Sequence, residues 1–92
     1  MKSKIFVIFD VKAGFYNKPF FMPNTNTAIR AFSDLANDEA TEIAKHPSDF
    51  SLYELGTYDD SVAKMELIDR TLVCTALETK KERFLIIDKE EK

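Results

Sequence analysis

The chain of 92 residues begins with apolar residues in the spacing of strands. Residues 5–11 form a compact run of β-branched and aromatic side chains, which predicts a buried central strand. Residues 13–18 predict a loop in which Gly14 can adopt a positive φ. Residues 18–22 then predict a second short strand, with Pro19 near its start, where a missing N–H is tolerated.

The following segment has the periodicity of a helix. From Thr27 the apolar residues return every three or four positions until the pattern ends near Asn37, which is typical of one buried helix face. The acidic segment 38–45 predicts one short helical turn, and Pro47 ends it because the residue before proline avoids the α region. Side-chain oxygens that can cap the main helix come from Asn24, Thr25 and Asn26.

The second half of the chain predicts strands joined by polar turns. Residues 59–61, Asp-Asp-Ser, are typical of a turn, and the runs 63–68 and 70–77 predict two further strands after it. Residues 84–87 form a last apolar cluster, as strand or helix. The alternating segment 50–58 predicts a strand before the turn, with Phe50, Leu52, Glu54, Gly56 and Tyr58 on one side and Ser51, Tyr53, Leu55 and Thr57 on the other.

This order of elements predicts an α+β fold. We expect a small single domain in which one main helix packs on a mostly antiparallel sheet of four to five strands. The domain is expected to span residues 1–88, and residues 89–92 are expected to form a polar C-terminal tail.

The composition is that of a soluble globular protein, with 45% hydrophobic and 32% charged residues. A net charge of −3 argues against a histone-like protein that coats duplex DNA by charge alone. Cys74 is the single cysteine, so no intramolecular disulfide can form, which fits a reducing compartment. Asp10 interrupts the first apolar run and leaves it too short for a signal sequence or a membrane span. We therefore expect a cytoplasmic protein without a membrane partner.

Charge and aromatic residues are unevenly distributed along the chain. The first thirty residues carry five lysines or arginines, one acid and six of the eleven aromatics, whereas residues 31–69 carry ten acids and two bases. A basic, aromatic-rich segment is what a small single-strand-binding surface would contain, because phosphates need cations and unstacked bases need flat rings. The plainer alternative is that the rings belong to the core and the lysines are ordinary solvated side chains.

Cations and rings alternate most closely on the predicted first loop. A base could stack on Phe15 or Tyr16 for about 1–3 kcal/mol each, while Lys12 and Lys18 hold the flanking phosphates. Arg30 follows the start of the predicted helix, where backbone N–H groups favour an anion. The predicted nucleic-acid-binding residues are Lys2, Lys4, Lys12, Phe15, Tyr16, Lys18 and Arg30.

The sequence offers little for catalysis, and we expect no enzyme, cofactor or metal site. The one histidine, His46, precedes a proline on a predicted loop, and Cys74 lies in a strand-like run where a small buried hydrophobe is expected. The acidic pairs Asp38-Glu39 and Asp59-Asp60 lack the spacing of a metal-binding loop. With one histidine and two glycines, the chain cannot assemble a glycine-rich phosphate loop or a zinc motif of usual spacing.

Several short motifs occur in the order and spacing of one phage family. They are Pro19-Phe20, Ala28-Ile29-Arg30-Ala31-Phe32, Asn37-Asp38, the segment PSDFSLYELG at 47–56, and Asp59-Asp60. Over roughly residues 4–67 the chain resembles the small nonstructural protein of gokushovirus-type phages, the small circular single-stranded DNA phages of the Microviridae. Beyond the turn the family pattern has D-x-x-x-G-K, whereas this chain has Asp60-Ser61-Val62-Ala63-Lys64, without the glycine.

The resemblance implies a non-enzymatic phage accessory protein in the cytoplasm of the infected bacterial host. Its expected partner is single-stranded DNA, during viral genome replication or the switch to packaging. In the alternative interpretation, the chain docks on a phage or host replication protein without touching DNA. A homodimer is expected in either case, through residues 5–9, the exposed side of the 50–58 strand, or residues 84–87.

Overall fold

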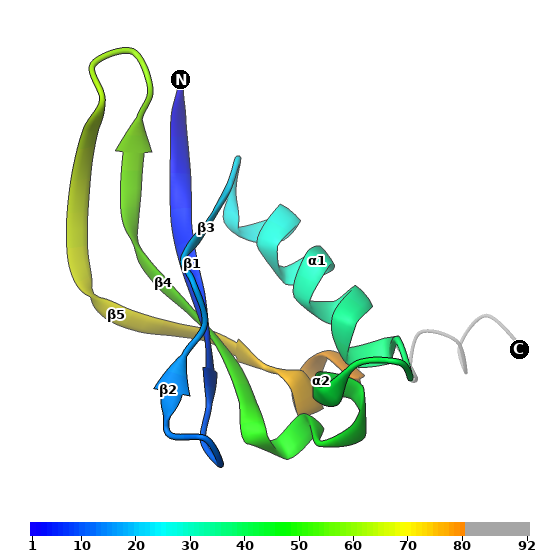
Figure 1. Cartoon of the computed structure of the whole chain (residues 1–92). Coiled ribbons are helices and arrows are strands. Elements are labelled where there is room, and N and C mark those ends of the chain that lie inside the picture. The colour runs from blue at the N-terminus through cyan, green and yellow to red at the C-terminus, as the bar shows by residue number, and fades with distance from the viewer. Residues whose placement is uncertain (81–92) are drawn as a thin grey trace, which may run out of the picture.

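The computed structural model describes residues 1–80, which form a sheet with helices on one side (Figure 1). The strands and helices before residue 40 are β1 (Lys2–Asp10), β2 (Phe15–Tyr16), β3 (Phe20–Met22) and α1 (Thr25–Asn37). The later elements are α2 (Glu42–Lys45), a 3-10 turn (Pro47–Asp49), β4 (Phe50–Asp59) and β5 (Lys64–Thr75). The described chain ends in helical residues 76–80.

The sheet has five strands, and every strand pair is antiparallel. The strand order is β2-β1-β4-β5, and β3 pairs with β1 on the same edge as β2. The short strands β2 and β3 therefore follow one another along one side of β1, and β4 covers the other side. This architecture confirms the predicted α+β class.

The core lies between the sheet and α1. Phe6 of β1, Phe32 of α1 and Leu52 of β4 are its largest fully buried side chains. Asn24 caps the helix, because its Oδ1 accepts a hydrogen bond from the backbone N of Thr27 at 2.8 Å. We call the sheet face that packs against α1 the inner face and the opposite face the outer face.

A bulge in β4 changes which side chains share a face. Phe6 pairs with Glu54, but the preceding residue Ile5 pairs with Gly56, so Leu55 has no partner on β1. Gly56 and Tyr58 therefore point to the outer face together with Tyr53. The sequence-based assignment of Gly56 and Tyr58 to the side of Leu52 was wrong, because strict alternation fails wherever an extra residue is inserted.

The two strands predicted at 63–68 and 70–77 are one continuous strand, β5, which ends at Thr75; residues 76 and 77 are already helical. The prediction of two strands was wrong because the break around residues 68–70 is an irregularity in pairing. On β4 the pairing moves from Glu54 to Gly56, while on β5 it moves from Thr71 to Leu67. Figure 1 shows that β5 bends sharply along its length. We call the part beyond this bend, residues 56–67, the arm.

Smaller differences concern the connections. The segment 13–18 was predicted as a loop, but Phe15 and Tyr16 pair with Asp10 and Phe9 as the short strand β2. The predicted short helical turn is α2. The predicted cluster 84–87 and the tail 89–92 lie outside the described residues. Among residues 1–80, no helix has the length and apolar character needed to cross a membrane.

Candidate nucleic-acid interface

An aromatic cluster with one cation occupies the outer face of the sheet. The rings of Phe9 and Tyr16 lie 4.6 Å apart between centroids, and the Tyr16 and Tyr53 rings meet edge to face at 6.2 Å. The guanidinium of Arg70 lies over both tyrosines, 4.6 Å from the centroid of Tyr53 and 5.7 Å from that of Tyr16. We call Phe9, Tyr16, Tyr53 and Arg70 the aromatic cluster.

Strand pairing brings these residues together from four strands. Phe9 of β1 lies directly opposite Tyr16 of β2, and Tyr53 of β4 lies opposite Val7, two residues from Phe9. Residues that oppose each other or sit two positions apart on paired strands point to the same face, so their rings meet. Asn17 holds β2 in this register.

Asn17 makes two hydrogen bonds to the same residue of β1. Its side-chain Oδ1 accepts a hydrogen bond from the backbone N of Ile8 at 2.7 Å, and its own backbone N donates to the Ile8 carbonyl at 2.9 Å. A two-residue strand has little pairing of its own, so this pair of bonds fixes the position of the adjacent Tyr16.

Arg70 reaches Tyr16 across the outer face. It belongs to β5, whereas Tyr16 belongs to β2 at the opposite edge, three strand spacings or about 14 Å away in a flat sheet. The two long side chains extend toward each other across this span, and the guanidinium lies 5.7 Å from the Tyr16 ring centroid. The smaller side chains of Ile5 and Val7 on this face are buried, although neither α1 nor α2 packs on it.

The cluster offers a planar cation and aromatic rings to a ligand. Tyr16 is 38% exposed, Arg70 is exposed, and Phe9 and Tyr53 are half-buried. Within residues 1–80 the Arg70 guanidinium forms no ion pair with a carboxylate. Its charge is therefore available to an anion, and the guanidinium plane and tyrosine rings can stack with flat groups.

The comparison with protein families places the chain among phage proteins. The family model described as Phage ORF5 protein matches residues 3–79. The chain belongs to this family. The match spans β1 to β5 and so includes all four residues of the aromatic cluster. No curated protein and no solved structure matches the chain.

The interpretation of the sequence as a phage protein is therefore confirmed. Of the seven residues predicted to bind nucleic acid, the structure places some at or near the aromatic cluster and others away from it. Tyr16 belongs to the aromatic cluster, and Lys12 and Lys18 are exposed on the two segments that flank β2. Phe15 is 64% exposed but pairs with Asp10, so it points to the face opposite Tyr16. One base cannot stack on both of these neighbouring rings.

The other three predicted cations lie apart from the cluster. The Lys4 ammonium, on the inner face, contacts Thr25 Oγ1 at 3.1 Å and Glu54 Oε1 at 3.4 Å. Lys2 is exposed at the start of β1 and lies opposite Asp59 in the register of β1 with β4. Arg30 is exposed on α1, beside a shallow pocket formed with the residues around the helix start. These positions do not join the aromatic cluster into one basic surface.

Sequence reasoning missed three members of the cluster: Phe9, Tyr53 and Arg70. Phe9 looked like part of a central apolar strand, and Tyr53 alternated with Leu52 in the next predicted strand. Arg70 stood at the border of two predicted strands, with no local signal for the ring contact. Only the pairing of distant strands places these side chains beside Tyr16.

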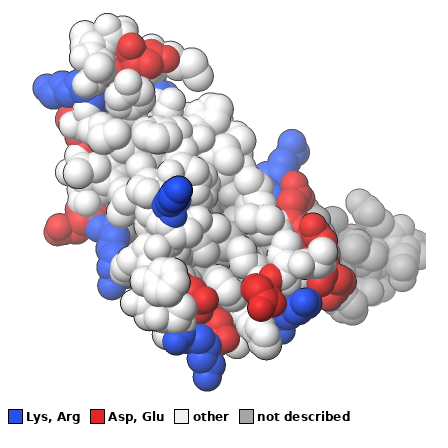
Figure 2. Space-filling view, in the orientation of Figure 1, with Lys and Arg blue, Asp and Glu red and all other residues white. Residues whose placement is uncertain are grey.

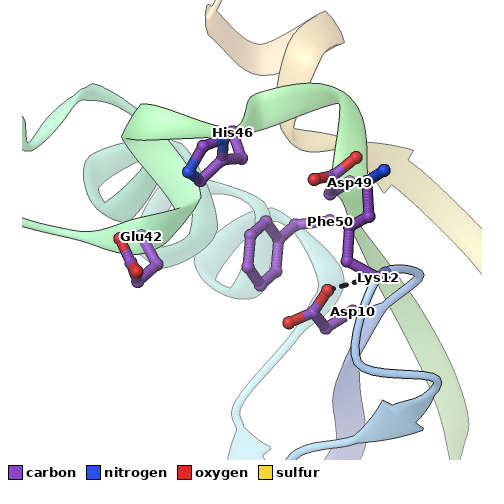
Figure 3. Close-up of a pocket in the computed structure, with 6 residues that line it drawn as sticks. All are labelled: Asp10, Lys12, Glu42, His46, Asp49 and Phe50. Atoms are coloured by element: carbon purple, nitrogen blue, oxygen red, sulfur yellow. Dashed lines mark hydrogen bonds between the residues drawn. The ribbon is translucent and has the colours of Figure 1, made fainter.

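An acidic pocket lies next to Lys12 at the end of the sheet. It has a volume of about 300 Å³ and is lined by three acids, Asp10, Glu42 and Asp49, with Lys12, His46 and Phe50. Figure 3 shows the carboxylates around the Phe50 ring, and the Lys12 backbone N donates to Asp10 Oδ1 at 3.0 Å. Within residues 1–80, no group of three or more potential ligands is arranged to hold a metal ion.

The charges seen from the side of Figure 1 are mixed. Figure 2 shows basic and acidic side chains interspersed along the borders of the molecule, and an otherwise uncharged centre that holds one basic side chain. On this side no continuous basic patch is present among the described residues. A ligand with a charged backbone would therefore rely on a few cations around an apolar and aromatic surface.

Proposed function

We propose that this phage protein is a non-enzymatic accessory factor that binds single-stranded DNA during viral genome replication or the switch to packaging. The observation that carries the proposal is the aromatic cluster, with the Arg70 guanidinium 4.6 Å from the Tyr53 ring centre on the sheet face that points away from α1. The motif resemblance described above further supports a gokushovirus-type phage of the Microviridae. The protein would act in the cytoplasm of the infected bacterium.

The proposed mechanism is occupancy of the strand. Unpaired bases stack on the exposed Tyr16 and Arg70 side of the cluster, at about 1–3 kcal/mol for each base–aromatic contact. Lys12 and Lys18, on either side of β2, contact the phosphates that flank the stacked bases. Duplex DNA keeps its bases paired and stacked, so it offers this surface only its phosphates.

The test is fluorescence anisotropy of a labelled oligothymidylate against the purified protein at several salt concentrations. Two phosphate contacts, from Lys12 and Lys18, predict that log K falls with log salt at a slope of about −1.4, and the variant K12Q/K18Q should bring that slope close to zero. Duplex DNA of the same length should compete poorly. Flat anisotropy at tens of micromolar protein in low salt would remove the proposal.

A matched pair of arginine variants locates the site. Arg70→Gln removes the cation over Tyr53, whereas Arg30→Gln removes the exposed cation of α1, and each variant lowers the net charge by one. We expect about a tenfold loss of affinity for Arg70→Gln and less than a twofold loss for Arg30→Gln. Equal losses would mean that binding depends on overall charge, and the assignment of the site would be wrong.

The acidic pocket favours a second candidate function, docking on a basic partner protein. Asp10, Glu42 and Asp49 line one pocket with the Phe50 ring. Such a pocket suits a lysine or arginine side chain of a phage or host replication protein, through charge and cation–π contact. This function predicts a partner recovered from infected cells whose binding is lost in Asp49→Asn, together with flat DNA anisotropy.

A further inference from the structure

The strand β5 is a long and exposed edge of the sheet. It is twelve residues long, pairs only with β4 among the described residues, and is exposed from Lys64 to Leu72. Edge strands are commonly guarded by charged side chains, bulges, proline, short length or a covering element, and of these β5 has charges and an irregularity between Leu67 and Thr71. The arm segment of β5 contains no proline and pairs regularly with β4 from Asp59 to Gly56. The backbone N–H and C=O groups along its open edge are therefore regularly spaced and can pair with another strand.

The arm segment carries apolar and charged side chains on separate faces. Met65 and Leu67 lie on the outer face and are 54% and 70% exposed. Lys64 and Glu66 alternate with them and point to the inner face. Within residues 1–80 neither of these two charges forms an ion pair. The edge therefore presents one cation and one anion without an ion pair, and two exposed apolar side chains. It is suited to a partner strand with an opposite charge at each of these positions and apolar side chains on the same face.

We propose that two copies of this chain pair antiparallel along the β5 arm, around a twofold axis at Met65. In this register Met65 faces Met65 of the second copy, and each Lys64 faces Glu66 of the other copy. The two ion pairs form on the inner face, and the apolar residues of both strands meet on the outer face. Leu67 of each copy lies on the same outer face, beyond the Met65 pair.

A second copy fits because, within the regularly paired residues 64–67, only the axis at Met65 places opposite charges against each other. A shift to an axis at Glu66 would place two Glu66 side chains opposite each other, which is unfavourable. The axis at Met65 instead matches opposite charges twice and leaves no like pair. This isologous arrangement uses one surface on both copies, as in most homodimers.

The proposed dimer does not depend on DNA binding, because the arm and the aromatic cluster use different parts of the sheet. Joining the two arms would extend the antiparallel sheet through both copies and leave both clusters uncovered. The pairing involves only a few residues of each strand and buries less than the roughly 800 Å² per partner of a standard interface. We therefore expect assembly at about 10–100 µM protein.

The decisive experiment is sedimentation equilibrium of the full chain and three charge variants from about 1 to 300 µM. The wild type should be monomeric at the lowest concentration and dimeric at the highest. Lys64→Glu and Glu66→Lys should each remain monomeric, because each places like charges opposite each other twice. The double variant K64E/E66K restores opposite charges and should recover the dimer. A monomeric wild type at 300 µM, or single variants that dimerise like the wild type, would overturn the proposal.

Cysteine cross-linking tests the register independently of affinity. In a Cys74→Ser background, Met65→Cys should form an intermolecular disulfide under mild oxidation, because directly opposed antiparallel residues have Cα atoms about 4.5–5.5 Å apart. Leu67→Cys is the matched control, since its two copies would lie about 14 Å apart. Cross-linking at 67 but not at 65 would exclude this register, and circular dichroism confirms that both variants are folded.

Discussion

The guanidinium carbon of Arg70 lies 4.6 Å from the centre of the Tyr53 ring, on the face of the sheet that points away from α1. Arg70 lies in the part of β5 where the pairing with β4 is interrupted, between Leu67 and Thr71. Its side chain lies on the outer face, over Tyr53 and toward Tyr16. The irregular segment of β5 thus carries the cation that lies above two tyrosines.

The opposite orientation of two adjacent aromatic residues leads to a direct comparison. Tyr16 belongs to the aromatic cluster and contacts the Phe9 ring, whereas Phe15 points to the inner face and is largely exposed. We expect Tyr16→Ala to weaken oligothymidylate binding by about 1–3 kcal/mol, through the loss of one stacking surface. Phe15→Ala is the control and should change affinity by less than twofold. A larger loss for Phe15→Ala, measured by the same anisotropy titration, would place the DNA on the inner face.

Gly56 is required where β5 passes close to β4. Its φ is +150°, and a Cβ at this position would collide with the carbonyl oxygen of Glu66 and lie 2.9 Å from Leu67 Cα. Since both contacts are backbone atoms, Gly56→Ala should lower the free energy of unfolding by about 3 kcal/mol or more.

Gly14 is the control for this substitution. It also has a positive φ, +77°, but an added Cβ would meet nothing within 4 Å. Gly14→Ala should therefore cost only about 1–2 kcal/mol, the strain of the left-handed backbone. Urea denaturation of both variants separates the cost of the positive φ from the cost of the collision with the β5 backbone. Equal costs would show that the backbone of Glu66 moves away without loss of stability.

Ala63, in the turn at the tip of the arm, is a position at which glycine should stabilise the fold. It adopts a φ of +55°, in the left-handed region where a side chain costs roughly 1 kcal/mol. Ala63→Gly should therefore raise the free energy of unfolding by a few tenths to about 1 kcal/mol, despite the greater entropy of glycine in the unfolded chain.

The same substitution in a helix gives the opposite sign. Ala31 lies inside α1, where glycine costs about 1 kcal/mol relative to alanine. Thermal or urea unfolding of both variants measures the difference. If Ala63→Gly were as destabilising as Ala31→Gly, the left-handed conformation at the turn would be incorrect.

The pH dependence of the arm centres on Asp59. The Ser61 hydroxyl and backbone N donate to Asp59 Oδ1 at 2.6 and 3.0 Å, and these hydrogen bonds hold the pKa of Asp59 below its ordinary value. A folded-state pKa below the unfolded one contributes stability above the unfolded value, and this stability is lost as pH falls through the folded pKa.

Removal of the hydroxyl tests this origin. Ser61→Ala should raise the pKa of Asp59 toward its ordinary value, measured by NMR titration of the side-chain carboxyl. The control, Ser48→Ala, changes an exposed serine away from the arm and should leave the pKa of Asp59 unchanged. An unchanged titration in Ser61→Ala would show that the hydroxyl does not hold the carboxylate.

The elements with strong local signals could be predicted from the sequence. The first strand, the helix capped by Asn24 and the strand that begins at Phe50 follow from apolar spacing and capping chemistry. Their antiparallel arrangement and the α+β class follow from the order of elements. These features depend on neighbours within a few residues, which the sequence displays directly.

The features that depend on strand register could not be predicted. The bulge at Leu55 moves Tyr58 to the face of Tyr53, and the irregular pairing around residues 68–70 keeps β5 continuous while bending it. A glycine inside a strand often marks a bulge, so Gly56 is a local signal beside Leu55, whereas no glycine or proline marks residues 68–70. The cluster of Phe9, Tyr53 and Arg70 with Tyr16 follows from that register, so only one member of it was predicted.

The most direct measurement is a ¹⁵N–¹H correlation spectrum of the protein titrated with oligothymidylate at low salt. Binding at the aromatic cluster should give the largest shifts at Phe9, Tyr16, Tyr53 and the Arg70 side chain, while Arg30 on α1 remains unchanged. Shifts confined to α1 or to the inner face would contradict the outer-face site. A spectrum without any change at saturating oligonucleotide would contradict DNA binding itself.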